Sequence, residues 1–164
     1  MSVLTLACDP GECLGIAWGV DDRLVACDAS TPSGVLVVPA CINGQTFVAP
    51  SRALFELPKY YGAKAYGHPA KATAIANSLI RESVTLGEWK RQARALGFEC
   101  EEFFPRDWKG QVKKRTMCKR VIARLTRDER RMVSATLKQM KLAPSKTHNV
   151  LDAIGMFFWK VGRL

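Results

Sequence analysis

The beginning of the chain constrains the fold most, because short apolar runs alternate there with tight turns. An apolar run over residues 3–9 ends in an acid, Pro10-Gly11 forms a turn, and a second apolar run covers residues 14–20. Asp21-Asp22 forms the next turn before a short strand over residues 23–27. Short apolar runs joined by such turns are typical of β-hairpins. We therefore expect the chain to open with three consecutive antiparallel strands.

The later elements alternate between strand and helix patterns. Residues 53–57 are apolar up to Pro58 and predict a buried strand. Residues 70–96 predict a long helix that ends before Gly97, with a break allowed near Gly87. The glycine- and proline-rich residues 31–50 predict an irregular loop or extra short strands. We expect an edge strand over residues 98–104, two basic helices over 109–125 and 128–140, and a final apolar helix over 147–161. This order predicts an α/β fold with a mixed sheet.

Length and composition favour one globular domain over residues 1–164. The chain is 48% hydrophobic and 24% charged, which gives enough apolar surface for one core. No apolar stretch is long enough to span a membrane, and the start lacks the basic region of a secretory signal. We expect a cytoplasmic protein without membrane contact. Its six cysteines are expected to be reduced, and the lack of a Cys-x-x-Cys pair argues against structural zinc.

The positive charge of the chain lies in one stretch. Residues 106–141 hold thirteen Lys and Arg against three acids, which accounts for the whole formal net charge of +10. Such a concentration favours a surface that binds a polyanion, and nucleic acid is the leading partner. The alternative that this stretch forms two solvated basic helices without a ligand stays open. An acidic membrane surface is disfavoured, because the stretch lacks a strongly apolar face.

Three acids stand at positions where a charge is costly. Asp9 ends an apolar strand, Glu56 interrupts an apolar strand, and Asp152 lies inside an apolar helix. Buried carboxylates are rare unless they are paired or bind a cation, and a group of carboxylates suits Mg²⁺ or Mn²⁺. Each acid taken alone could also be a capping or turn residue. His148 and Asn149 lie one helical turn before Asp152, so either could complete a metal site or orient water.

An acid cluster beside a basic stretch predicts a metal-dependent nuclease. Two divalent ions held by carboxylates can align a water molecule and stabilise the leaving oxygen in phosphodiester hydrolysis. His148 and Asn149 also have plain interpretations, as a surface imidazole and as a helix cap. The joint pattern is more specific than any of its members.

The motif Asp9-Pro10-Gly11-x-x-x-Gly15, Glu56 and the segment 148–153 resemble the RNase H-like superfamily. Within it they are most similar to the RuvC-type Holliday junction resolvases, especially small phage-encoded members, which would act in the host cytoplasm. The resemblance implies an RNase H-like fold with a mixed five-stranded sheet flanked by helices. It implies two Mg²⁺ ions, replaceable by Mn²⁺, on Asp9, Glu56 and Asp152. Family spacing puts the fourth ligand at Asn149, but we expect the better ligand, His148, to take this catalytic role.

The resemblance also implies the substrate. Members of this family are homodimers that cut branched DNA, in particular four-way junctions, during DNA recombination and repair. Tyr60 and Tyr61 lie where the family carries a base-stacking aromatic, although loop or core packing explains them equally well. Residues 104–110 and the cations that follow resemble the DNA-contacting segment of the phage members. The expected DNA-binding cations are Lys109, Lys113, Lys114, Arg115 and Lys119.

Three other functions stay open. Actin-like and sugar-kinase ATPases share the first-strand signature, but they need two such domains to enclose a nucleotide, and the chain is long enough for one. An RNA-processing nuclease of the same superfamily would share the acids and differ in its substrate. A non-catalytic DNA-binding protein would have no reason to place Glu56 and Asp152 inside apolar elements.

Overall fold

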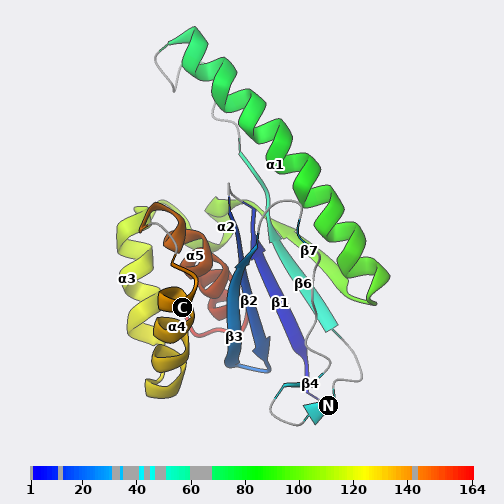
Figure 1. The fold of residues 1–164 in the computed structure, drawn as a ribbon, viewed down its shortest axis with the longest axis vertical. Coiled ribbons are helices and arrows are strands. Elements are labelled where there is room, and N and C mark those ends of the chain that lie inside the picture. Colours follow the sequence, from blue (N-terminus) through cyan, green and yellow to red (C-terminus); the bar gives the residue numbers. More distant parts are fainter. Residues whose placement is uncertain are drawn as a thin grey trace.

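The computed structural model describes residues 2–10, 13–30, 34, 41–42, 45–46, 51–59, 68–141 and 144–164. The strands are β1 (Leu4–Asp9), β2 (Leu14–Val20), β3 (Arg23–Ser30), β4 (Cys41–Ile42), β5 (Gln45–Thr46), β6 (Ser51–Glu56) and β7 (Glu99–Phe103). The helices are α1 (Pro69–Ala95), α2 (Pro105–Lys109), α3 (Lys114–Arg124), α4 (Arg127–Gln139) and α5 (Pro144–Lys160) (Figure 1).

Five strands form one mixed sheet in the order β3-β2-β1-β6-β7. The first three are joined as antiparallel hairpins, whereas β6 pairs with β1 and β7 pairs with β6 in parallel. This is the RNase H-like topology, and it confirms the predicted α/β fold with three antiparallel strands first. β4 and β5 form a separate two-stranded sheet.

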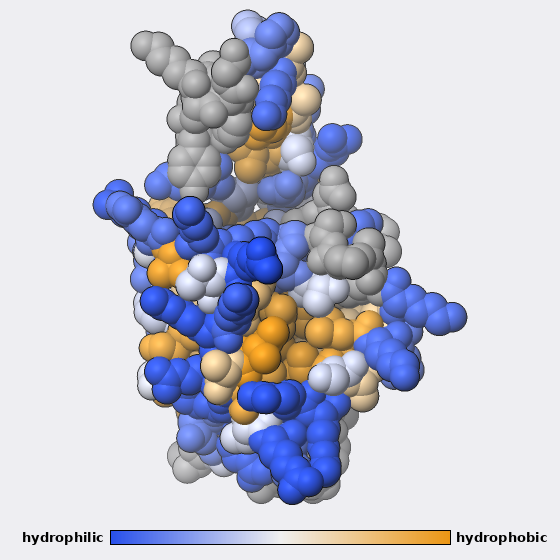
Figure 2. All heavy atoms as spheres, turned by 90° about the vertical axis from the view of Figure 1, so that its left-hand side faces the viewer, coloured by the Kyte–Doolittle hydropathy of each residue, from blue (hydrophilic) through white to orange (hydrophobic). Residues whose placement is uncertain are grey.

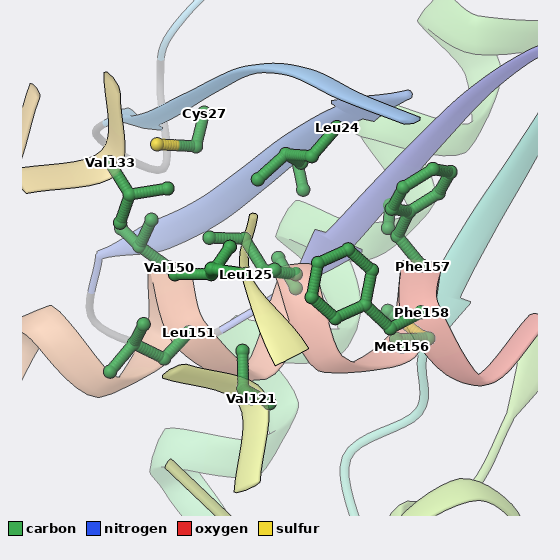
Figure 3. Packing of buried hydrophobic residues seen from close by; sticks show 14 of the residues in the cluster. Leu24, Cys27, Val121, Leu125, Val133, Val150, Leu151, Met156, Phe157 and Phe158 are labelled. Atoms are coloured by element: carbon green, nitrogen blue, oxygen red, sulfur yellow. The ribbon is translucent and has the colours of Figure 1, made fainter. Parts of the chain in front are cut away.

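Helices cover both faces of the sheet (Figure 1). Strand residues alternate between the two faces, so Leu6 and Cys8 pack toward α1, whereas Ala7 packs toward α5. The core on the α5 face also takes in apolar residues of α3 and α4, which Figure 3 shows around Val150 and Phe157. Burial of each large apolar side chain contributes roughly 1.5–3 kcal/mol, so these two cores hold the layers together.

Small residues on β2 let α5 lie close to the sheet. A Cβ atom on Gly15 would come within 2.1 Å of the carbonyl oxygen of Asn149 in α5. A Cβ atom on Gly19 would come within 2.0 Å of the Phe157 ring. Both distances are far below van der Waals contact, so larger residues would push α5 away. The glycines therefore set the height of α5 over β1 and β2.

The structure corrects the bounds of one predicted helix and shows that another is unbroken. The helix expected over 109–125 begins later, as α3 at Lys114, and Gly110, with a φ of +58° that favours glycine, separates it from the unpredicted short helix α2. The helix α1 runs through Gly87 without a break. A single helical glycine costs about 1 kcal/mol, and burial of Leu86 and Trp89 beside it outweighs this cost.

Some predictions fall on residues outside the described part of the chain. Tyr60 and Tyr61 are among them, and so is most of the segment 31–50, in which β4 and β5 agree with the alternative of extra short strands. The cysteines that the structure describes outside β4 are free thiols, as predicted: Cys8, Cys13, Cys27, Cys100 and Cys118. No helix within the described ranges is long and apolar enough to cross a membrane.

Candidate active site

Asp9 and Glu56 are the last residues of two neighbouring parallel strands. Because β1 and β6 run in the same direction, both acids lie at the same edge of the sheet. Cys8 pairs with Phe55, so the next residues of the two strands, Asp9 and Glu56, lie opposite each other. The alternation of strand residues turns both toward the α5 face. Asp9 is 7% exposed and Glu56 is 9% exposed.

Helix α5 brings Asp152 to this edge of the sheet. Asp152 is 1% exposed, and the same pocket contains Asp9, Glu56 and Asp152. On α5, Asp152 lies one turn after Asn149, whose side chain reaches Cys13 just before β2, and one turn before Gly155, against which the Trp108 ring packs. The pocket is lined by Asp9, Pro10, Glu56, Glu82, Lys109, Lys114, Lys146, His148, Asn149 and Asp152.

The short helix α2 supplies two partners for these carboxylates. Trp108 donates a hydrogen bond from Nε1 to Oε2 of Glu56 over 2.6 Å. The Lys109 ammonium lies 3.2 Å from Oε2 of Glu56 and 3.3 Å from Oδ2 of Asp152. The Trp108 ring packs against Gly155 of α5, where a Cβ atom would come within 2.8 Å of it. Glu56 is therefore oriented by α2, and α2 is seated on α5.

Burial and mutual repulsion make the Asp9 and Glu56 carboxylates difficult to ionise. Burial raises the pKa of Asp9 well above its usual value, and the charges of Glu56 and Asp152 raise it further. Burial also raises the pKa of Glu56, although Lys109 and the Trp108 hydrogen bond oppose this rise. Burial lowers the pKa of the Lys109 ammonium, but the nearby carboxylates outweigh it and raise that pKa. The group of acids therefore favours a cation.

His148 and Asn149 are both at the pocket but have different surroundings. Burial, followed by the charge of Lys114, lowers the pKa of His148 and so favours the neutral imidazole, the form that binds metal ions. Asn149 donates from Nδ2 to the carbonyl oxygen of Cys13 over 2.6 Å. This hydrogen bond fastens the first part of α5 to the start of β2. The Asn149 side chain therefore has a structural task, which the His148 side chain does not share.

The donors of the site suit a divalent ion, but their present arrangement is incomplete. Carboxylate oxygens are the ligands that Mg²⁺ and Mn²⁺ prefer. Oδ1 of Asp152 is buried and has no hydrogen-bond partner among the described residues, so it is free to bind a cation. Within those same residues, however, no three His, Cys, Asp or Glu side chains are grouped so that they could hold one ion. The site therefore fits a divalent ion by the chemistry of the oxygens that Asp9, Glu56 and Asp152 supply, and not by their present grouping.

The predicted DNA-binding cations fall into two sets. Lys113, Lys114 and Arg115, which we call the α3 cations, stand exposed at the start of α3, and Lys119 is exposed further along it. Figure 2 shows this side of the molecule, where hydrophilic side chains surround a central apolar area. Lys109 differs, because its side chain is 16% exposed and its ammonium is paired with carboxylates.

Two residues of the pocket were not singled out in the sequence. Glu82 reaches it from α1 and accepts a hydrogen bond from Ser78, and Lys146 reaches it from the start of α5. Neither residue interrupts an apolar pattern, so nothing in the local sequence distinguishes it from the other charged residues nearby. Their place follows from the packing of α1 and α5 and has no local signal.

Comparison of the chain with protein-family models, with curated proteins and with solved structures gave no match. The RNase H-like topology therefore rests on the strand order and pairing of the sheet.

Proposed function

We propose that the chain is a metal-dependent, structure-selective endodeoxyribonuclease of the RuvC type, which resolves four-way or other branched DNA. One observation carries the proposal. Three buried carboxylates from β1, β6 and α5 line one pocket, and that pocket opens next to the α3 cations. The Lys114 ammonium belongs to both features, since it lines the pocket and lies 3.9 Å from Oδ2 of Asp152.

The residues divide the work between metal and DNA. Asp9, Glu56, Asp152 and His148 would hold two Mg²⁺ ions, or Mn²⁺ in their place. The ions, when bound, activate a water molecule and stabilise the leaving oxygen of the phosphodiester. Trp108 keeps the Glu56 carboxylate in one orientation through its hydrogen bond.

The cations would hold the DNA beside these ligands. The α3 cations and Lys119 contact backbone phosphates, which positions the scissile strand at the pocket without reading its sequence. A homodimer would present two such pockets to the two symmetric strands of a junction. Sedimentation of the protein with and without junction DNA tests this assembly, and a monomer on the junction would contradict it.

Catalysis explains the burial of the carboxylates better than DNA binding alone. A protein that only binds a polyanion loses affinity by placing three acids beside its cations, since like charges repel. The desolvation that raises the pKa of Asp9 and Glu56 also costs folding free energy. Such a cost is typical of functional sites.

Cleavage assays with three labelled substrates test the proposal. A four-way junction, a linear duplex and an RNA–DNA hybrid are incubated with the protein in Mg²⁺ or in a chelator. We expect cleavage of the junction in Mg²⁺ alone. Asp9→Asn, Glu56→Gln and Asp152→Asn should each remove cleavage and leave junction binding in place. The matched control is Glu99→Gln, which changes an exposed carboxylate at the start of β7 and should keep full activity.

The outcomes separate the alternatives. Cleavage of the hybrid in preference to the junction would replace the proposal with an RNA-processing nuclease. Junction binding without cleavage in any divalent ion would leave a DNA-binding protein. Full activity in one of the three carboxylate variants would remove that residue from the site.

A further inference from the structure

The carboxylate pocket already contains a cation of the protein itself. The Lys109 ammonium lies between Glu56 and Asp152, at 3.2 Å and 3.3 Å from their nearest oxygens. It also lies 4.7 Å from the centre of the Trp108 ring, a favourable distance for a cation over an aromatic face. The side chain is 16% exposed, whereas that of Lys114 is 52% exposed. Lys109 is therefore a built part of the pocket.

The position of this ammonium conflicts with that of a divalent ion. An ion bound by Glu56 and Asp152 needs the oxygens that now face Lys109, and two cations within a few ångströms repel each other strongly in a buried site. Oδ2 of Asp152 faces both Lys109 and Lys114, while Oδ1 has no hydrogen-bond partner in the described part of the chain.

The Lys109 side chain can leave this position without unfolding the site. It belongs to α2, which has five residues and is followed by Gly110. A lysine carries its charge on a flexible stem of four carbons, so the ammonium can turn to solvent or to a phosphate while the backbone stays in place. Trp108, which precedes it, remains bound to Glu56 through Nε1.

We propose that Lys109 is a displaceable counter-cation, which neutralises the carboxylates until a divalent ion takes its place. The inference rests on the proposed function, because it takes Asp9, Glu56 and Asp152 as the metal ligands. It assigns Lys109 to the control of metal loading, in contrast to the phosphate contact expected from its place in the basic stretch. An ion bound between Glu56 and Asp152 must displace the ammonium, so the lysine weakens metal binding and stabilises the protein without metal.

Metal binding to the full chain, without nucleic acid, tests this role. Mn²⁺ is titrated into the protein, and the free ion is measured by its electron paramagnetic resonance signal. Lys109→Gln should bind Mn²⁺ about tenfold more tightly or better, because one unit charge is removed from the immediate surroundings of the ion. Lys109→Arg should stay as weak as the parent protein. Lys119→Gln, which removes an exposed cation of α3, is the control and should leave the affinity unchanged.

Thermal unfolding gives a second measurement of the same role. Without metal, Lys109→Gln should unfold at a lower temperature than the parent protein, since its carboxylates lack a counter-charge. Mn²⁺ should raise the unfolding temperature of this variant more than that of the parent protein. A loss of stability that Mn²⁺ does not restore would mean that Lys109 only fills space, and would overturn the proposal.

The results distinguish a failure of this inference from a failure of the proposed function. Equal Mn²⁺ affinity in the parent protein and in Lys109→Gln would overturn the counter-cation and leave the metal site standing. Absence of Mn²⁺ binding in both proteins would overturn the metal site itself. Asp9→Asn, introduced into Lys109→Gln, should abolish the tight binding, and unchanged binding there would also remove the metal site.

Discussion

The Glu129 carboxylate is expected to make one of the largest single contributions to stability in the chain. It caps the start of α4, where Oε2 accepts from the backbone N–H of Thr126 over 2.8 Å, and Oε1 accepts from the N–H of Leu24 in β3 over 2.9 Å. Arg163 donates to both oxygens, each over 2.7 Å. This cluster joins α4, β3 and the end of the chain, and it is remote from the carboxylate pocket.

The pKa of Glu129 gives the size of the effect. Burial alone would raise this pKa, but the hydrogen bonds from Arg163, Thr126 and Leu24 outweigh it and lower the pKa from 4.5 to about 2. A difference of this size corresponds to about 3 kcal/mol of folding free energy at pH 7. Glu129→Gln should lose about this amount and lower the unfolding temperature by roughly 6–12 °C.

The pH dependence follows from the sign of the shift. Because the folded-state pKa is depressed, the stabilisation is complete above pH 4.5 and is lost as the pH falls toward 2. At about pH 3 the contribution of Glu129 should have fallen to about 1.4 kcal/mol. The difference in unfolding free energy between the parent protein and Glu129→Gln, measured by urea denaturation at both pH values, should shrink accordingly. A difference below about 1 kcal/mol at pH 7, or one that does not change with pH, would refute this reasoning.

Three further predictions concern the pocket and its surroundings. His148→Ala should reduce the cleavage rate more than Asn149→Ala, whereas denaturation should show a loss of about 1–3 kcal/mol for Asn149→Ala alone, since the Cys13 carbonyl loses its buried partner. Gly15→Ala should cost about 3 kcal/mol in thermal unfolding and lower cleavage by displacing α5, while Gly87→Ala, with nothing within 4 Å, should raise stability by up to about 1 kcal/mol and leave cleavage unchanged. Replacement of the three α3 cations by Ala should weaken the salt dependence of duplex binding. The slope of the logarithm of the binding constant against the logarithm of the salt concentration should fall by up to about 3, with the preference for junctions retained. These assignments would be contradicted by a larger rate loss in Asn149→Ala than in His148→Ala, by normal cleavage in Gly15→Ala, or by an unchanged salt slope without the α3 cations.

The sequence predicted the elements of the sheet well because their signals are local. Apolar runs that end at Pro10-Gly11 and Asp21-Asp22 determine the hairpins through turn chemistry and side-chain alternation alone. The short helix α2 was missed, because it has only five residues and its place depends on the packing of Trp108 against Gly155 of α5. Local patterns do not contain that information.

The candidate acids were identifiable for a similar reason. Asp9, Glu56 and Asp152 each interrupt an apolar pattern, and the desolvation cost of a charge makes such positions recognisable from the neighbouring residues alone. The parallel pairing of β1 and β6 then explains why two of them meet at one edge of the sheet.

The partners of these acids depended on tertiary structure alone. Trp108 and Lys109 lie 52 and 53 residues from Glu56, and no periodicity links them to it. Their contacts require α2 to sit on Gly155 and α5 to approach β2 at Gly15, which depends on the packing of the whole α5 face. By itself, then, the sequence determined which residues carry charge at a cost, because burial and turns act locally. The tertiary structure decided which cation compensates each charge, because that depends on distances of a few ångströms between distant segments.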